Sequence, residues 1–220
     1  MATRFYLPAA AATTPMSPTP DAAWEDQSIL ARAMTSTTPI GDTMATVTFP
    51  DDANAANKDI LYRQYVSAAL AASQTVTGGQ AIKAQCRVME VDVGNNLFFT
   101  IGIRVIASDG STVQKTVLTV TRDNGEASAS ALTNRQYTAT SAVTDYTTVA
   151  GDRLVIEIGM GGDPGVGSAH DSSMRLGDSA ASDLPEDGTD TTDKRPWIEL
   201  TDTLTFASTG GNPWYAYAQQ

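Results

Sequence analysis

Apolar and polar residues alternate along most of the chain from residue 44 onward, with a period of two. In 44–49, Ala, Val and Phe alternate with Met and Thr, and in 197–206 Ile, Leu and Phe alternate mainly with Thr. This alternation is typical of half-buried β-strands, and almost no stretch has a helical period. The segments that we expect to be strands are 44–49, 60–66, 74–77, 80–93, 97–107, 113–122, 135–140, 146–149, 153–160, 173–176 and 197–206.

Turn residues separate these segments. The strongest turn signal is Asp109-Gly110, which follows the apolar run 97–107 and favours a type I′ hairpin. Gly94-Asn95-Asn96 and Asp123-Asn124-Gly125 mark two further turns. Many short strands with frequent turns predict an all-β fold, specifically a jelly-roll-type antiparallel β-sandwich.

Residues 1–43 lack any period. Four prolines in its first 20 residues favour extended or irregular chain over helix, although one short helical turn starting near Asp21 and running to about Met34 is compatible with the pattern. Large apolar side chains in this segment are expected to dock either on the chain's own domain or on a neighbour. They are Phe5, Tyr6, Leu7 and Trp24. We therefore expect an extended N-terminal arm over 1–43, a sandwich over 44–206 and a tail over 207–220.

The tail combines two glycines with a cluster of aromatic residues, Trp214, Tyr215 and Tyr217. These side chains could anchor the tail in a neighbouring subunit or stack on a sugar. The remaining alternative is that the tail is disordered. An aromatic cluster after a Gly-Gly hinge favours the anchor.

The composition narrows the function classes. The chain has 14 Lys and Arg against 25 Asp and Glu, which gives a formal net charge of −11. Nucleic-acid binding depends on basic groups, so we expect no nucleic-acid partner. No apolar run approaches the roughly 18 residues of a membrane-spanning helix, and the start does not resemble a signal peptide, so no membrane partner is expected. Cys86 is the single cysteine, which excludes an intrachain disulfide, and we expect it to be a small buried residue.

Two segments superficially offer catalytic chemistry. The glycine-rich stretch 159–168 follows a strand, but it lacks the lysine and the following helix of a phosphate-binding loop. His170, the only histidine, adjoins Asp171 and Ser168 in one loop, whereas a catalytic triad needs groups held on separate elements. We therefore expect that the chain has no catalytic residues and is not an enzyme.

An acidic segment near the C-terminus is the best candidate for a metal site. Its carboxylates are Asp178, Asp183, Glu186, Asp187, Asp190 and Asp193. Oxygen ligands in an irregular loop suit Ca²⁺, although the spacing does not match an EF-hand. The alternative, which the spacing favours, is a solvated acidic loop without any cofactor.

Several stretches together resemble a known group of proteins. They are RFYLP at 4–8, AAWE at 22–25, RQYVS at 63–67, AGDRLVIEIG at 150–159, RLGD at 175–178, SDLPED at 182–187 and PWIEL at 196–200. This combination is similar to jelly-roll virion structural proteins of tailed bacteriophages.

The resemblance implies a location in the virion and a role as a capsid decoration or cement protein. The major capsid protein and other virion proteins are the implied partners, and a homo-oligomer, such as a trimer at a local three-fold axis, is the implied assembly. In that role the arms at 1–43 and 207–220 would clamp adjacent subunits. The alternative is a tail-fibre or appendage module that binds cell-surface glycan, with Tyr137 and Tyr146 as stacking residues.

Overall fold

The computed structural model describes residues 2–49, 58–91, 93–94, 96–129, 131–163, 171–189 and 193–207. Within them the regular elements are strands. The strands are β1 (Thr3–Tyr6), β2 (Ala31–Met34), β3 (Ala45–Phe49), β4 (Lys58–Ala69), β5 (Thr75–Val76), β6 (Ala81–Glu90), β7 (Asn96–Ile106), β8 (Val113–Glu126), β9 (Thr133–Thr140), β10 (Tyr146–Thr147), β11 (Arg153–Asp163), β12 (Ser172–Leu176) and β13 (Trp197–Leu200). Among the described residues, no helix is long and apolar enough to cross a membrane.

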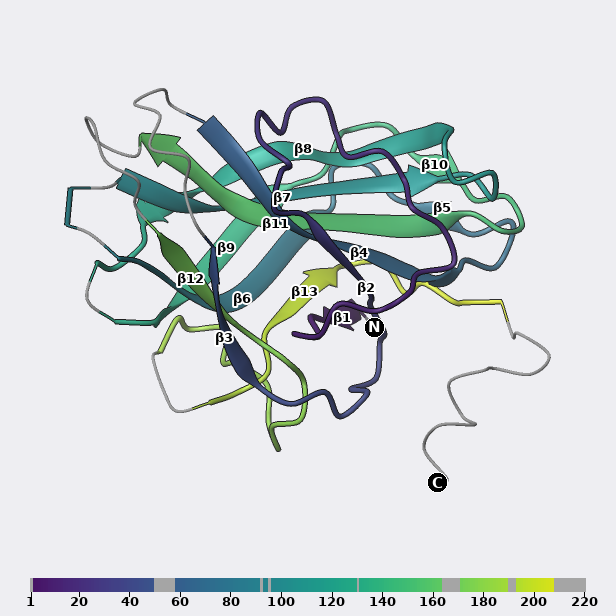
Figure 1. Ribbon diagram of the computed structural model, residues 1–220. Coiled ribbons are helices and arrows are strands. Elements are labelled where there is room, and N and C mark those ends of the chain that lie inside the picture. Colours follow the sequence, from purple (N-terminus) through teal and green to yellow (C-terminus); the bar gives the residue numbers. More distant parts are fainter. Residues whose placement is uncertain are drawn as a thin grey trace.

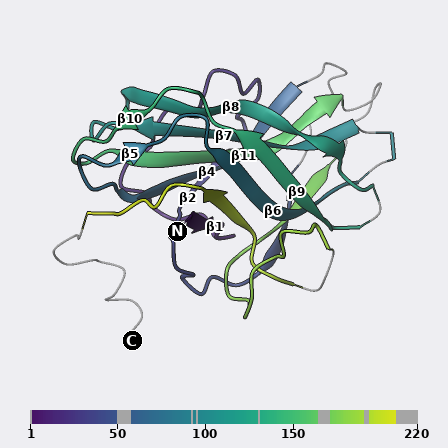
Figure 2. The same ribbon diagram turned by 180° about the vertical axis from the view of Figure 1, so that it is seen from behind.

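The strands form two facing sheets, which confirms the all-β sandwich (Figure 1). One sheet has five strands in the order β2-β4-β11-β7-β8, and only β2 runs parallel to its neighbour. The other has six strands: β9 flanks one side of β6, while β13 and β12 share its other side and carry β1 and β3 at the edges. β5 and β10 form a separate small ribbon. Figure 2 shows the layers from behind.

The core lies between the two sheets because successive side chains of a strand point to opposite faces. On β11, Leu154, Ile156 and Ile158 point inward and are fully buried. Aromatic rings join the layers: Phe49 of β3 stacks on Tyr62 of β4, with ring centroids 4.0 Å apart. The segments 97–107 and 153–160, which the sequence predicted to be strands, correspond to the central strands β7 and β11.

The expected hairpin at Asp109-Gly110 is present between β7 and β8, but its turn is not type I′. Gly110 has a φ of 75°, whereas Asp109 is not among the described residues with positive φ. The Asp109 carboxylate instead accepts hydrogen bonds from the amides of Ser111 and Thr112, each 2.8 Å long. These bonds and the Thr112 hydroxyl lower the pKa of Asp109 to about 2, the hydroxyl contributing most.

The N-terminal segment, defined here as residues 2–36, belongs to the sandwich, so the boundary expected at residue 43 does not separate an arm from a domain. β1 pairs with β13 in one sheet, and β2 pairs with β4 in the other. The Tyr6 amide donates to the Ser36 carbonyl at 3.0 Å, which joins the two sheets along this side. The helical turn expected up to Met34 is wrong, because 31–34 finds backbone partners on the edge of β4.

The N-terminal apolar residues fill the chain's own core. Phe5 and Leu7 are fully buried, and Phe5 makes an edge-to-face contact with Phe206 at 6.0 Å between ring centroids. Tyr6 and Trp24 are also buried. Of the two docking partners left open by the sequence, the structure shows the chain's own domain: in this arrangement all four side chains are buried within one chain.

Replacing Phe5 with Ala therefore tests whether the N-terminal segment is part of the core. We expect a loss of about 3–5 kcal/mol in the free energy of unfolding, because a buried aromatic ring is replaced by a cavity. Urea unfolding followed by circular dichroism measures the loss. The matched control is Val143→Ala, since Val143 is 85% exposed and its removal should change stability by less than about 0.5 kcal/mol. Equal effects of the two substitutions would show that β1 does not complete the core.

Candidate functional site

A hollow on the outer face of the five-stranded sheet holds Trp24. It lies over the central strand β11, where a Cβ on Gly159 would come within 2.8 Å of the Trp24 ring and 1.9 Å of the Ile60 carbonyl oxygen. A Cβ on Gly102 of β7 would lie 3.8 Å from the indole nitrogen. Gly159 is therefore required for the close approach of the indole to the strand, and Gly102 leaves space beside it.

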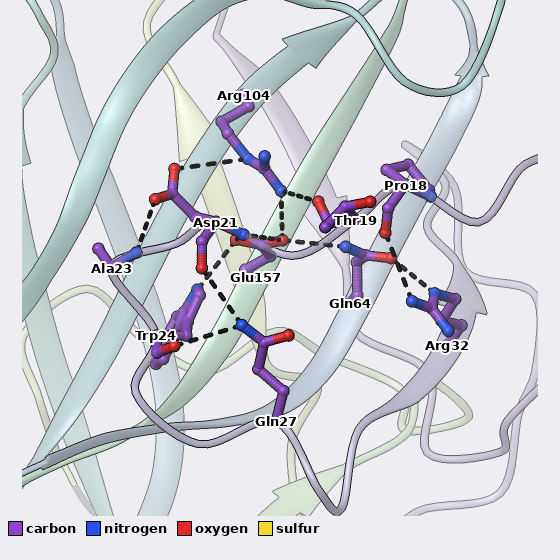
Figure 3. A network of polar contacts seen from close by, with 10 residues as sticks. All are labelled: Pro18, Thr19, Asp21, Ala23, Trp24, Gln27, Arg32, Gln64, Arg104 and Glu157. Carbon is purple, nitrogen blue, oxygen red and sulfur yellow. Dashed lines mark hydrogen bonds and ion pairs between the residues drawn. The ribbon is translucent and has the colours of Figure 1, made fainter.

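Glu157 of β11 is the polar centre of this hollow (Figure 3). Its carboxylate accepts hydrogen bonds from the Trp24 indole at 2.9 Å, the Gln64 amide at 2.9 Å and the Arg104 guanidinium at 2.5 Å. The backbone amide of Asp21 lies 3.3 Å from both oxygens. A buried carboxylate is tolerated only when it is paired and hydrogen-bonded, and Glu157 meets both conditions.

Arg104 of β7 links Glu157 to the N-terminal segment. Its terminal nitrogen Nη2 also donates to the Thr19 carbonyl at 3.0 Å, and its Nε lies 3.7 Å from the Asp21 carboxylate. The Arg104 and Glu157 side chains are only 6% and 1% exposed. Residues 19–24 therefore seal the ion pair from water, and in this arrangement the Glu157 carboxylate recognises the chain's own segment.

We call this set the Glu157 socket. It consists of Gln64, Gly102, Arg104, Glu157 and Gly159. Three adjacent strands, β4, β7 and β11, contribute to it, and their outward positions come into register through antiparallel pairing. None of these residues was singled out from the sequence as a candidate site. The available signal was a glutamate inside the apolar run 153–160, since a charge there requires a buried partner.

The acidic segment does not form the expected calcium site. Asp178 is buried and accepts hydrogen bonds from the amides of Ile40 and Asp42, both 2.7 Å long. Asp187 caps a turn through the Thr189 amide at 2.9 Å. Asp190 lies outside the described residues. Among the residues that the structure describes, no group of three or more His, Cys, Asp and Glu side chains is placed to hold a metal ion.

The remaining acidic side chains of this segment pair with cations on the outer face of the six-stranded sheet. Asp183 lies 2.9 Å from both Arg4 and Arg195. Glu186 lies 2.8 Å from Lys83 and 3.3 Å from Arg4. Asp193 pairs with Arg175 and, at 3.4 Å, with Arg87. The carboxylates therefore spread over a basic sheet face instead of converging on one ion.

A small apolar cluster holds the same loop in place. Leu184 packs with Tyr6 and Trp197, and the Trp197 indole donates to the Leu184 carbonyl at 2.7 Å. The Arg4 guanidinium lies over the Trp197 ring at 3.7 Å from its centroid. Tyr6 donates its hydroxyl to Asp183 at 3.1 Å, and its burial together with that carboxylate raises the pKa of its phenol. The sequence prediction of a solvated acidic loop is thus wrong for Asp183 and Leu184, which dock on the sheet, whereas Glu186 and Asp187 are exposed.

Other residues considered from the sequence have structural roles or lie outside the description. Cys86 is buried in the core, and burial raises the pKa of its thiol to about 12. Tyr137 is fully buried, and the Tyr146 hydroxyl donates to Asp152 at 2.6 Å, so neither is presented as the stacking platform expected for a glycan. His170 lies outside the described residues, as does the aromatic tail. The tail residues concerned are Trp214, Tyr215 and Tyr217.

A cleft of about 330 Å³ lies between β8 and β9, where the two sheets have edge strands. Threonines of both strands dominate its lining, together with Asn124 and Arg122. The strands approach at either end of the cleft: the Ala142 amide donates to the Val117 carbonyl at 2.8 Å, and the Tyr137 hydroxyl donates to the Thr121 carbonyl at 3.2 Å. The cleft is thus a short polar slot along this side of the sandwich.

Comparison with known proteins gives structural likeness but no family. No protein-family model matches the chain, and no curated protein matches it in sequence. Among solved structures, an α-amino acid ester hydrolase matches 93% of this chain with a TM-score of 0.49 and 8% identity. A CocE/NonD family hydrolase from Staphylococcus aureus matches 92% with a TM-score of 0.45 and 10% identity. An infectious bursal disease virus structure matches 75% with a TM-score of 0.29 and 12% identity.

These matches contradict the expectation that the chain is not an enzyme, and that expectation is withdrawn. Two of the structures that it resembles along more than nine-tenths of its length are hydrolases. The chain spans 36% of the length of each of those two hydrolase chains and 37% of the viral chain. At these TM-scores and identities, the likeness carries none of their activities over to this chain.

Replacing Glu157 with Gln tests the socket. We expect a loss of about 3–5 kcal/mol in the free energy of unfolding, because Arg104 would then be buried without its main counter-charge. Denaturant unfolding followed by circular dichroism measures the loss. The control is Glu199→Gln, which removes a more exposed partner of Arg4 and should cost less than about 1 kcal/mol. A cost for the Glu157 variant no larger than that of the control would contradict a sealed ion pair.

The docked acidic loop should be released by acid. Hydrogen bonds from Lys83 and Arg175 lower the pKa values of Glu186 and Asp193. Because the folded-state pKa values are lowered, this stabilisation is present above the unfolded values of about 4 and is lost as pH falls through the lower folded values. In an NMR titration the Trp197 indole signal should change before that of Trp24, which reports on the rest of the fold.

The matched variant for this titration is Glu186→Gln combined with Asp193→Asn. It should remove the early change of Trp197 and leave the later one. Simultaneous changes of both indole signals in the unmodified protein, or an unaltered titration in the variant, would argue that these ion pairs do not hold the loop.

Proposed function

We propose that the chain is a structural protein of a tailed-phage virion, a capsid decoration protein that holds neighbouring subunits together. The major capsid protein is the proposed partner, and a homo-oligomer such as a trimer is the proposed assembly. The resemblance carried by stretches such as RFYLP at 4–8 and AGDRLVIEIG at 150–159 supports this role. A net charge of −11 agrees with it, because like-charge repulsion limits adhesion to DNA.

The observation that carries the proposal is the position of Ala207, the last residue that the structure describes. The Ala207 amide donates to the Ala69 carbonyl at 2.8 Å, at the end of β4. Thirteen residues follow Ala207, among them Trp214, Tyr215 and Tyr217. Fully extended, 13 residues span up to about 45 Å, which is long enough to reach an adjacent subunit. Since the N-terminal segment is built into the core, we assign the clamp to residues 208–220.

Ending the chain at Ala207 should remove the protein from particles while leaving its fold intact. We expect at least about a tenfold loss of copies per purified particle, because buried aromatic residues carry much of the energy of interfaces. Quantitative mass spectrometry of the particles measures the copies, and circular dichroism checks the fold.

The triple variant W214A/Y215A/Y217A keeps the length of the tail and should behave as the truncation does. The matched control Q219A/Q220A should retain full occupancy. Unchanged occupancy of the triple variant would rule out the aromatic tail as the clamp.

A further inference from the structure

The N-terminal segment is held together as one piece. The Tyr6 amide and the Thr35 hydroxyl connect its two ends, through bonds of 3.0 Å to the Ser36 carbonyl and 2.7 Å to the Tyr6 carbonyl. Between these ends the Ala12 amide donates to the Arg32 carbonyl at 2.9 Å. These bonds connect the two ends and the middle of the segment to one another, in addition to the pairing of its strands with β13 and β4.

Its contacts with the rest of the sandwich are made with residues 40–207, which we call the body; the amides of Ala9 and Ala10, for example, donate to the Asp42 carboxylate. β1 lies against β13, β2 lies against β4, and residues 19–24 cover the Glu157 socket. Arg4 adds ion pairs to Asp183 and Glu199. The body thus presents two strand edges and one polar socket that are complementary to a single segment.

A short exposed bend connects the segment to the body. Thr37, Thr38 and Pro39 are exposed, and within the bend the Ser36 hydroxyl accepts a hydrogen bond from the Thr38 amide at 3.1 Å and shares one with the Thr38 hydroxyl at 3.3 Å. Pro39 disfavours helical backbone at Thr38 and favours an extended conformation there. Beyond the bend, the amides of Ile40 and Asp42 are tied to Asp178 of the body. Residues 37–39 are therefore the natural hinge, and extended they span about 10 Å.

We propose that residues 2–36 are exchanged between two copies of this chain, so that the segment of one copy occupies the strand edges and the Glu157 socket of the other. The partner is a second copy because the socket is complementary to this particular segment: an indole at Trp24, a backbone amide at Asp21 and a carbonyl at Thr19. The exchange rests on the proposed function in one respect: copies that are neighbours on a particle surface have a high local concentration.

The protein concentration determines whether the segment binds to its own chain or to a second copy. An exchanged pair keeps every contact between segment and body and loses only the bend at 37–39, so the exchange costs little contact energy. Within one chain the short connection gives an effective concentration of about millimolar order, which favours the closed monomer in dilute solution. Exchange should therefore rise steeply as the protein concentration approaches that value.

A disulfide between β1 and β13 reports which chain supplies the segment. Arg4 and Glu199 lie directly opposite each other on these antiparallel strands, and their side chains are partly exposed. Opposite Cα atoms in such pairs lie about 4.5–5.5 Å apart, which suits a disulfide. The variant R4C/E199C is prepared in ¹⁴N and ¹⁵N forms, which are mixed, unfolded in urea, refolded over a range of concentrations and oxidised. Cys86 is buried and does not compete.

We expect the link between positions 4 and 199 to join peptides of the same isotope in dilute samples. Links between ¹⁴N and ¹⁵N peptides should increase as the concentration during refolding approaches about 1 mM. The single variants R4C and E199C measure random cross-linking and should give no such link. Native mass spectrometry of the unmodified protein, refolded in the same way, should show a dimer at the same concentrations.

Same-isotope links alone at every concentration, with a monomer in native mass spectrometry, would overturn the exchange. Failure of positions 4 and 199 to form any link would overturn the pairing of β1 with β13 on which the exchange depends. These measurements use purified protein without particles, so their failure is separate from a failure of the tail variants to change occupancy.

Discussion

A carboxylate on the outer face of the central strand sets the arrangement of the N-terminal segment of this protein. Glu157 lies on the face of β11 that points away from the core, where a charged side chain would normally contact water. Instead it is 1% exposed and pairs with Arg104. A charge removed from water needs hydrogen bonds to all of its oxygens, and the strands alone supply them only from Gln64 and Arg104. Trp24 and Asp21 complete the set, so the segment that carries them must cross this face.

The same segment determines how the two sheets are joined. On one side of the sandwich, β1 and β2 meet through Tyr6 and Ser36, whereas on the other side β8 and β9 leave a polar cleft. The N-terminal segment thus seals the core along one edge and covers the sheet above it. The acidic loop covers the outer face of the six-stranded sheet. Its carboxylates pair there with cations that alternate with core residues on β1, β6 and β12. The acidity of the chain is therefore partly internal to the fold.

The sequence allowed the strands of the sandwich body to be predicted, but not the N-terminal segment and the acidic loop that pack on the outer faces of its sheets. The apolar runs 97–107 and 153–160 predicted strands, and these strands are β7 and β11 in the middle of the five-stranded sheet. The strands β1 and β2 carry no comparable signal: each has four residues, and prolines and alanines surround them. Their structure comes from pairing with β13 and β4, which are distant in sequence. Likewise, Arg4, Lys83 and Arg175 face the acidic loop only because three strands bring them to one face.

The central claim is that the Glu157 socket and the N-terminal segment form one cooperative unit. Hydrogen exchange of the Trp24 indole and of the Leu61 amide, which donates to the Asp26 carbonyl at 2.8 Å, tests it most directly. If the segment is integral to the fold, both groups should exchange only through global unfolding, as slowly as the amides of Ile156 and Ile158 in β11. Exchange of the Trp24 indole as fast as that of the exposed turn at Ser111, while β11 stays protected, would contradict the account.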